Sequence, residues 1–388
     1  MAASNFMVML LLIFLGLITS AYLGLVVAFI YGWKKIPEFK LKGNSSENSF
    51  SIIIPFRNEA ENLPNLFKSL TNLNYPSRKF EILLVNDAST DHSRQLAEIF
   101  QNEFQELHIK VLDNIKNSTS PKKDAIRTAI HVSKFDYIAT TDADCIVPAN
   151  WLHYFDEMIF SNNSKMIAGP VGFIQDSARR KAYFQRFEEL DFISLQASTV
   201  GAFGIDKAFM CNAANMCYEK ETFLRESGFN ADAGIASGDD VFLLQQLRKK
   251  GLKVDFVKSA KAAVLTNLQQ NLSGLMAQRI RWAAKTSSYS SNFAKATGII
   301  VFLKNFSLIV FSVLALLGLI PYQFLMLVFL LKFIADFILI HKSAKFMKSE
   351  ELMRNYFWSS IVYPFFTSYV AILSLVKDFK WKGRRFKK

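Results

Sequence analysis

The stretch Tyr137-Ile138-Ala139-Thr140-Thr141-Asp142-Ala143-Asp144 decides the fold and the site that we expect in this chain. A short apolar run with the character of a β-strand ends in two carboxylates that are one residue apart. Mg²⁺ takes oxygen ligands, uses one or two carboxylates, and leaves its other positions to water and phosphate groups. The pattern therefore predicts a metal site that holds a diphosphate, with a solvated turn as the alternative for an isolated Asp-X-Asp.

Two earlier segments have the same form. The apolar run Phe50–Pro55 predicts a buried parallel strand, and Arg57-Asn58-Glu59 and a helical pattern follow it. The run Phe80–Asp87 also ends in a carboxylate, and Ser89-Thr90-Asp91 is expected to cap the helix that follows. A weaker strand over His108–Leu112 precedes a helix that begins near Pro121-Lys122-Lys123.

The alternation of strands and helices predicts an α/β fold with a mostly parallel, Rossmann-like sheet and right-handed crossovers. Ligands of such sheets bind outside the carboxyl ends of the strands. This rule places Pro55 to Glu59, Asp87 and Asp142 to Asp144 at one edge, although they are far apart in sequence. Three acidic strand ends at one edge predict a nucleotide site.

The second half of this region carries further expected elements. Two adjacent acids, Asp239 and Asp240, stand at the start of a helix, where a favourable interaction with the helix dipole would be enough to explain them. The amphipathic segment Arg179–Val200 is expected to pack on the domain core, with a position in the membrane surface as the alternative. The remaining expectations are an edge strand within 166–173, a strand over 211–216, a helix over 241–250 and a helical stretch around 278–282.

Part of the chain must lie in lipid, because 51% of its 388 residues are hydrophobic. Residues 1–33 contain no charged side chain and are long enough to cross a bilayer, so we expect a retained transmembrane helix rather than a signal peptide. The block Ile299–Ile340 is about twice the roughly 20 residues of one crossing and contains Pro321, which predicts a helical hairpin. The segment Tyr356–Val376 is the weakest candidate because Pro364 interrupts it.

The net charge of +13 is concentrated beside the apolar segments, in residues 245–300 and in the C-terminal tail. This placement indicates a cytoplasmic surface that faces anionic lipid headgroups, and no motif supports nucleic-acid binding. Four full crossings that begin outside would leave the basic tail outside, against the positive-inside rule. We therefore expect that Tyr356–Val376 does not simply cross the membrane.

Lys332 and Asp336 share a helix face and are expected to neutralise each other, with a polar acceptor headgroup as the alternative partner.

The expected domain organisation has four parts. Residues 1–33 form the N-terminal transmembrane helix and residues 34–49 a linker. Residues 50–296 form the catalytic domain. Residues 297–388 form the membrane region, with a hairpin over 299–341, a third segment over 356–376 and the basic tail.

Five motifs resemble, in the same order, those of glycosyltransferase family 2, the inverting nucleotide-sugar enzymes with a GT-A fold, and in particular its membrane-bound branch. That branch includes ceramide glucosyltransferases and the hyaluronan, cellulose and poly-N-acetylglucosamine synthases. The resemblance covers Ser51 to about Lys285. The motifs are Ile52-Ile53-Ile54-Pro55 with Asn58-Glu59, Val85-Asn86-Asp87 with Ser89-Thr90-Asp91, Asp142-Ala143-Asp144, Gly238-Asp239-Asp240, and Gln278-X-X-Arg281-Trp282.

The resemblance implies a role for each matching residue. Asp144 and Asp142 would hold Mg²⁺ or Mn²⁺ on the diphosphate of the donor, and Asp240 would deprotonate the acceptor hydroxyl, with Asp239 as the alternative base. The other implied donor contacts are Pro55, Arg57, Glu59, Asp87, Lys122 (or Lys123) and Arg281, and the implied acceptor or diphosphate region is Gln278, Arg281, Trp282 and Asn215.

The sequence thus predicts a multi-pass protein of the cell (inner) membrane with a cytoplasmic catalytic domain. We expect it to transfer a sugar from a nucleotide-sugar, favouring a UDP-sugar, to a membrane lipid. A processive polysaccharide synthase is the alternative, and a sugar-nucleotide binder without catalysis is a third interpretation. The sequence specifies neither the sugar and the acceptor nor the oligomeric state.

Overall fold

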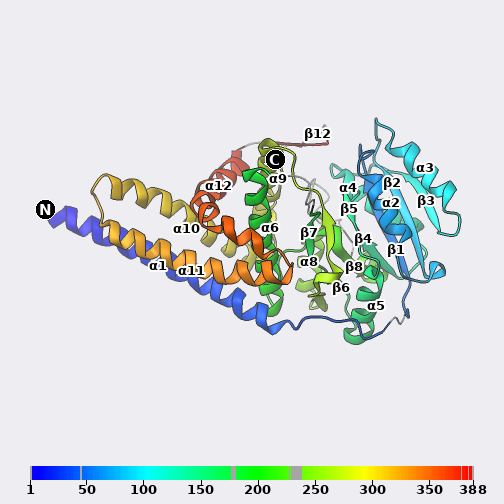
Figure 1. Cartoon of the computed structure of the whole chain (residues 1–388), viewed down its shortest axis with the longest axis horizontal. Helices are drawn as coiled ribbons and strands as arrows, with labels where there is room; N and C mark the ends of the chain where they lie inside the picture. Colours follow the sequence, from blue (N-terminus) through cyan, green and yellow to red (C-terminus); the bar gives the residue numbers. More distant parts are fainter. Residues whose placement is uncertain are drawn as a thin grey trace.

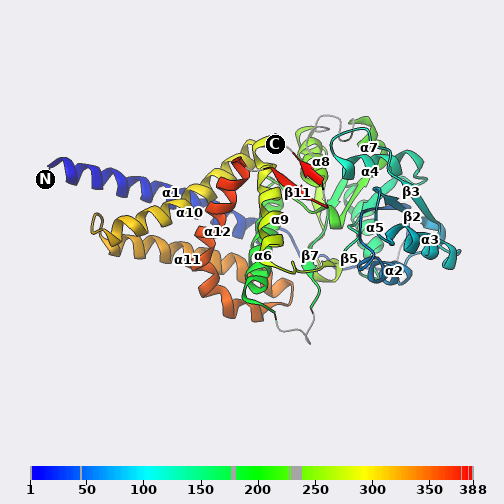
Figure 2. The same cartoon turned by 90° about the horizontal axis from the view of Figure 1, so that it is seen from above.

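The computed structural model describes residues 2–43, 46–175, 181–226, 228, 238–376, 378–382 and 384–386. An α/β domain lies at one end, and long apolar helices extend from it to the other end, where the N-terminus lies (Figure 1). Helices α6 and α9 stand between the sheet and these long helices (Figures 1 and 2). The catalytic and membrane-directed parts are therefore packed together and are not joined only by a linker.

The main sheet has seven strands in the order β3-β2-β1-β4-β8-β6-β9. The first four are mutually parallel, β8 runs antiparallel to both β4 and β6, and β9 is parallel to β6. The predicted mostly parallel α/β fold is therefore confirmed. The strands are β1 (Phe50–Phe56), β2 (Phe80–Asn86), β3 (Ile109–Asp113), β4 (Tyr137–Thr140), β6 (Met166–Ala168), β8 (Met216–Glu219) and β9 (Val254–Phe256).

Helices cover both faces of this sheet because successive strand residues point to opposite sides. Ile52 and Ile54 of β1 belong to the cluster that includes α2 and α5, whereas Ile53 packs with residues of α4. All three isoleucines are fully buried, which explains why the strand is a continuous apolar run. The helices are α2 (Leu63–Thr71), α3 (Ser93–Glu103), α4 (Pro121–Val132) and α5 (Trp151–Asn162).

Two strand predictions need correction. The expected edge strand within 166–173 is two strands that separate at Gly169-Pro170: β6 lies inside the main sheet, and β7 (Val171–Phe173) joins a second sheet with β5 (Cys145–Ile146) and β10 (Val264–Thr266). A side chain at Gly169 would place its Cβ 2.4 Å from the Asn215 amide, so this close approach requires glycine. The expected strand over 211–216 begins only at Met216, after a 3₁₀ turn at Ala213–Asn215.

Helix α6 (Tyr183–Gly204) packs along α1 (Ala2–Lys35) through a glycine contact. A Cβ on Gly32 would lie 2.0 Å from the Gly201 carbonyl oxygen, and a Cβ on Gly204 would lie 1.9 Å from the Gly32 carbonyl oxygen. Helix α6 contacts β7 and β9, which confirms in part the expected packing on the domain, but it packs mainly on the membrane-directed helices α1 and α11. Arg179, the expected start of the segment, lies outside the described residues. Next come α7 (Lys220–Arg225), α8 (Asp239–Lys249) and α9 (Leu272–Ala284).

Four helices of the described chain are long and apolar enough to cross a membrane. They include α1, α10 (Asn292–Leu316) and α11 (Tyr322–Phe346), the last two forming the predicted hairpin. The fourth, α12 (Tyr356–Val376), continues through Pro364, where we expected an interruption. It runs across the direction of α1, α10 and α11 in both views, and the chain after it returns to the α/β domain as the hairpin β11 (Phe379–Trp381) and β12 (Arg384–Phe386) (Figures 1 and 2).

Candidate active site

The register of the sheet brings the predicted site residues to one edge. Phe56 of β1 pairs with Asn86 of β2, and Ile53 pairs with Thr140 of β4. The residues that follow these strands therefore emerge side by side. The cavity at this edge is lined by all the donor and metal residues proposed from the sequence, namely Pro55, Arg57, Glu59, Asp87, Lys122, Asp142, Asp144 and Arg281.

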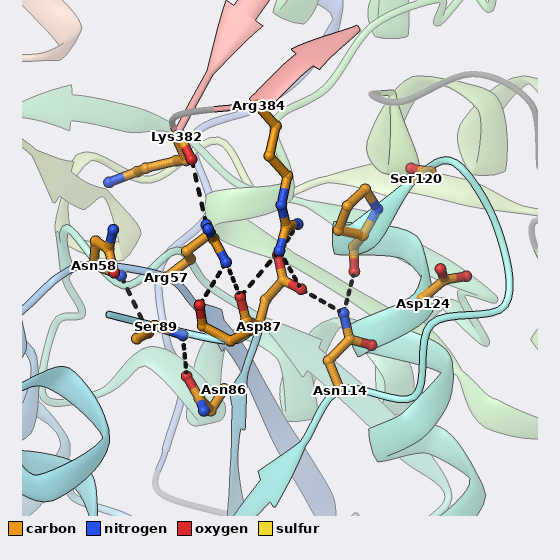
Figure 3. Close-up of polar contacts among 12 residues, drawn as sticks. Arg57, Asn58, Asn86, Asp87, Ser89, Asn114, Ser120, Asp124, Lys382 and Arg384 are labelled. Carbon is orange, nitrogen blue, oxygen red and sulfur yellow. Dashed lines mark hydrogen bonds and ion pairs between the residues drawn. The ribbon is translucent and has the colours of Figure 1, made fainter. Parts of the chain in front are cut away.

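Asp87 lies at the centre of one half of the site (Figure 3). The side chain is 7% exposed, and its Oδ1 accepts a hydrogen bond of 2.9 Å from Asn114 Nδ2. Arg57 Nη1 donates to the main-chain oxygens of Asp87 and Ala88. Arg384 of the C-terminal hairpin also reaches this carboxylate, with Nη1 2.5 Å from Oδ2. The carboxylate proposed to bind the nucleoside is therefore already paired with a cation.

The loop after β1 is fixed to the loop after β2. Asn58 has a φ of +52°, and its Oδ1 accepts a hydrogen bond of 2.8 Å from the Thr90 amide. The Ala60 amide donates to Asp91 Oδ2. Asp91 Oδ1 also accepts from the Ser93 amide two positions on. The N-cap residue of α3 is His92, which makes no side-chain cap, so the helix begins later than the cap that we expected at Ser89-Thr90-Asp91. These hydrogen bonds hold Arg57 and Glu59 beside Asp87.

The other half of the site contains the metal candidates. Ligand atoms of Asp142, Asp144 and Cys145 lie within 4.8 Å of one another. Burial, followed by the negative charges of Asp142 and Glu59, raises the pKa of Asp144 to about 6. A divalent cation would relieve this repulsion, and carboxylate oxygens are the ligands that Mg²⁺ and Mn²⁺ prefer, so the residues fit a metal.

Lys122 joins the metal candidates to the acidic pair at the start of α8. Its Nζ lies 2.7 Å from Asp142 Oδ1 and 3.3 Å from Asp239 Oδ2. Burial alone would lower the pKa of Lys122, but these carboxylates raise it above its usual value. Lys123, the alternative contact, is fully buried with its ammonium over the Phe242 ring. The structure therefore favours Lys122 as the cation that faces the site.

Asp239 and Asp240 differ in their surroundings. Asp239 is buried, and although burial would raise its pKa, Lys122 and Lys285 hold it below its usual range. Asp240 also lines the cavity. Its Oδ2 accepts a long 3.3 Å hydrogen bond from the Ala213 amide, and its Oδ1 accepts one of 2.7 Å from the Val241 amide. Lys285 Nζ lies 3.9 Å from Asp240 Oδ1. Of the two acids, Asp240 is the better placed to receive a proton from a ligand in the cavity.

Helix α9 contributes the motif Gln278-Arg279-Ile280-Arg281-Trp282 to the cavity wall. Arg281 is partly exposed there, and desolvation lowers its pKa against the opposing effect of Asp142 and Asp239. The guanidinium of Arg279 stacks over the Trp282 ring at 4.4 Å and pairs with Asp191 of α6, with Nε 2.6 Å from Oδ2. Arg279 therefore fixes the orientation of Trp282 at the cavity mouth.

Asn215 does not line the cavity, in contrast to the acceptor role expected for it. It is 1% exposed, and its Oδ1 accepts from Trp151 Nε1 at 2.9 Å. Its Nδ2 donates to the main-chain oxygens of Pro170 and Ala262. The side chain thus connects the main sheet to the second sheet. Its neighbours Ala213 and Ala214 are the residues that reach the cavity.

Sequence reasoning gave no role to several residues at the site. Lys285 lies one turn after Arg281 on α9, so a helical reading of this stretch would have found it. Asp191 lies inside the amphipathic segment Arg179–Val200, which we expected only to pack on the domain core. Lys382 and Arg384 lie in a basic tail that we assigned to lipid headgroups, and no local pattern distinguishes these two from the other tail cations.

The fold is that of GT-A glycosyltransferases. The structure of mannosyltransferase PcManGT from Pyrobaculum calidifontis, in complex with GDP-Man and Mn²⁺, superposes with a TM-score of 0.60 at 16% identity, over 94% of this chain and 99% of that one. At this identity the likeness concerns the fold alone.

The sequence comparisons identify the family. Residues 51–224 match the model of glycosyl transferase family 2, so this part of the chain is a domain of that family. It is 30% identical over 123 residues to glycosyltransferase AglE of Haloferax volcanii, a match that covers 32% of this chain and 39% of AglE. It is also 30% identical over 102 residues to the beta-monoglucosyldiacylglycerol synthase of a Nostoc species, which covers 26% of this chain and 21% of that enzyme. The poly-beta-1,6-N-acetyl-D-glucosamine synthase of Staphylococcus aureus is 23% identical over 230 residues, 58% of this chain and 52% of the synthase. The matched regions therefore span well under two thirds of these relatives.

Proposed function

We propose that this chain is an inverting, metal-dependent glycosyltransferase that passes a sugar from a nucleotide-sugar to a hydroxyl group of a membrane lipid. The observation that carries the proposal is one cavity of about 900 Å³ that joins two different environments. One end is lined by Asp87, Asp142 and Asp144, and the other by residues of all four long apolar helices. A polar donor and an amphiphilic acceptor could therefore meet inside it.

The apolar end of this cavity contains polar groups suited to a lipid headgroup or linker. Lys332 Nζ lies 2.5 Å from Asp336 Oδ2, which confirms the expected ion pair, and Tyr22 donates to Asp336 Oδ1 at 2.7 Å. The buried hydroxyl of Ser359 lines the same cavity and has no hydrogen-bond partner among the described residues. A buried hydroxyl without a partner is costly, so a polar ligand here would be favourable.

In the proposed reaction the donor lies at the strand edge and its diphosphate points toward Asp142 and Asp144. A metal bound there would stabilise the negative charge that develops on the leaving diphosphate. Lys122, Arg281 and Lys285 line the same cavity. Their positive charges would already be in position when negative charge develops on the diphosphate. The guanidinium fork of Arg281 suits two phosphate oxygens.

Asp240 would act as the base. It would take the proton of the acceptor hydroxyl as that oxygen attacks the anomeric carbon from the side opposite the leaving diphosphate, so the configuration inverts. A positioned base contributes roughly 10²- to 10⁴-fold in rate. Asp239 is held by Lys122 and would instead fix this lysine beside Asp142. Trp282 would shape the entrance for the acceptor.

The path of the chain supports a cytoplasmic catalytic domain with three crossings, by α1, α10 and α11. Helix α12 begins directly after the 3₁₀ helix Glu350–Asn355, and the segment that follows α12 returns to Asp87. With α12 at the membrane surface, the basic tail stays on the side of the domain, as the positive-inside rule requires. Labelling of a Lys388→Cys variant in right-side-out and inverted vesicles tests this topology, and labelling only from the outside would contradict it.

The function is tested by nucleotide release. The purified protein with Mn²⁺, UDP-sugars and GDP-mannose should release nucleotide diphosphate strongly only when a lipid extract is added, and thin-layer chromatography should show a new glycolipid. Asp240→Asn is the inactive control. Lipid-independent formation of polymer would contradict the lipid acceptor.

A processive polysaccharide synthase is the second candidate, because the match to the Staphylococcus aureus synthase extends over 230 residues. Against it, three crossing helices form a poor channel for a polymer without further subunits. Product length on a gel separates the two: one added sugar supports the lipid transferase, and a ladder supports the synthase.

A further inference from the structure

The C-terminal hairpin lies directly on the donor half of the cavity. Lys382 lies between its two strands, and its Nζ is 2.6 Å from Glu59 Oε1. Arg384 places Nη1 2.5 Å from Asp87 Oδ2, and its Nη2 is 3.3 Å from both Asp87 Oδ1 and the Asp87 main-chain oxygen. Two cations of the tail thus contact two carboxylates of the donor site. Figure 3 shows the pair of Arg384 and Asp87.

These contacts are not those of a surface tail. Glu59 and Asp87 are 8% and 5% exposed, and the side chains of Lys382 and Arg384 are only 31% and 23% exposed. Pairs shielded from water interact more strongly than exposed ones, whose contribution to stability is small. Lys382 also lowers the pKa of Asp144, so its charge is felt at the metal candidates.

The backbone of the hairpin has supports of its own. Strands β11 and β12 pair with each other, β11 contacts α9, and Arg57 Nε donates to the Lys382 main-chain oxygen at 3.3 Å. None of these contacts requires the ammonium of Lys382 or the guanidinium of Arg384. The hairpin can therefore stay in place while the two side chains change partners.

We propose that the C-terminal hairpin is a lid of the donor site, and that Lys382 and Arg384 bind the diphosphate of the nucleotide-sugar. Without donor, the two cations rest on Glu59 and Asp87. When donor enters, the nucleoside takes the carboxylate of Asp87, and the displaced cations turn to the phosphate oxygens. This inference rests on the proposed function, because it requires a nucleoside diphosphate in the cavity.

The exchange of partners is chemically balanced. Asp87 loses an arginine and gains hydrogen-bond donors of the nucleoside, while the phosphates gain an arginine fork and an ammonium, both of which suit phosphate oxygens. A nucleoside without phosphates could only compete with Arg384 for Asp87. The lid therefore favours the binding of diphosphates over that of the bare nucleoside. A segment that merely blocked the site would weaken the binding of both ligands.

The test compares two ligands on the full-length protein in detergent with Mn²⁺. Calorimetry measures the dissociation constants of UDP and uridine, and of GDP and guanosine, for wild type and for the double variant Lys382→Gln, Arg384→Gln. We expect the variant to bind the preferred diphosphate about tenfold or more weakly, because it loses charge-assisted contacts. It should bind the matching nucleoside as well as wild type or more tightly.

Two further proteins complete the design. Lys380→Gln removes one charge from the same tail and should bind both ligands like wild type. A chain that ends at Val376 should reproduce the double variant, which excludes a local effect of the glutamines. Diphosphate binding by the double variant that equals or exceeds that of wild type would overturn the lid. If wild type bound none of the nucleotides, the proposed function itself would fail.

Discussion

The guanidinium of Arg384 lies 2.5 Å from the carboxylate of Asp87, although 297 positions separate the two residues in the chain. Asp87 follows the second strand of the sheet, and Arg384 follows the last membrane-directed helix. The contact therefore ties the donor half of the catalytic domain to the membrane region.

The acidic pair of α8 provides the most direct test of catalysis. Asp240→Asn should lower kcat about 10²- to 10⁴-fold, because the amide cannot take the proton, and should leave nucleotide affinity unchanged. Asp239→Asn should instead weaken nucleotide binding, because Lys122 loses one of its two partners. Steady-state kinetics together with calorimetry distinguish the two effects. Equal kcat values for Asp240→Asn and wild type would exclude Asp240 as the base.

The metal candidates can be tested without turnover. The double variant Asp142→Asn, Asp144→Asn should lose Mn²⁺ binding in calorimetry or electron paramagnetic resonance, because both carboxylate ligands become neutral amides. Asp113→Asn is a suitable control, since Asp113 is the last residue of the edge strand β3 and its carboxylate pairs with Arg94 on the surface. Unchanged Mn²⁺ affinity in the double variant would place the metal elsewhere.

Much of the donor edge could be predicted from the sequence because it depends on local patterns. The apolar runs before Pro55, Asp87 and Asp142 each form a strand of four to seven residues, and parallel pairing then places their ends together. The metal candidates Asp142 and Asp144 follow from the same logic, whereas site roles for Lys122 and the acids of α8 were implied only by the resemblance to glycosyltransferase family 2.

The rest of the site depends on contacts that no local pattern encodes. The pairs Arg279–Asp191 and Arg384–Asp87 join residues that are 88 and 297 positions apart. The sequence around a charged residue does not show whether its side chain lies in solvent or in the site. One edge strand was expected within 166–173, but Gly169-Pro170 divides it, and the sheet that each half joins depends on partners from distant segments. Pro364 suggested an interruption, yet α12 remains continuous there because neighbouring helices support it.

A buried acid of α6 predicts how stability depends on pH. Burial raises the pKa of Glu188 to about 7, against the opposing effects of the Gln269 amide and Arg279. The folded protein thus holds this proton up to a higher pH than the unfolded chain, so stability falls as pH rises from about 4.5 to 7. Glu188→Gln removes the titration. Its melting temperature should exceed that of wild type at pH 8 and approach it at pH 5; equal differences at both pH values would contradict this assignment.

The glycine contact between α1 and α6 predicts a matched pair of variants in one helix. Gly32→Ala places a Cβ 2.0 Å from the Gly201 carbonyl oxygen, so the helices must separate, at a cost of about 1–3 kcal/mol for an overpacked contact. Gly24→Ala meets no atom within 4 Å and should be neutral or slightly stabilising. Thermal unfolding in detergent measures the stability of both variants.

Helix α6 carries Asp191, which holds Arg279 and through it Trp282. Gly32→Ala should therefore also raise the KM for the lipid acceptor while leaving nucleotide affinity unchanged. Equal melting temperatures and acceptor KM values for the two variants would show that the α1–α6 contact does not support the acceptor side of the site.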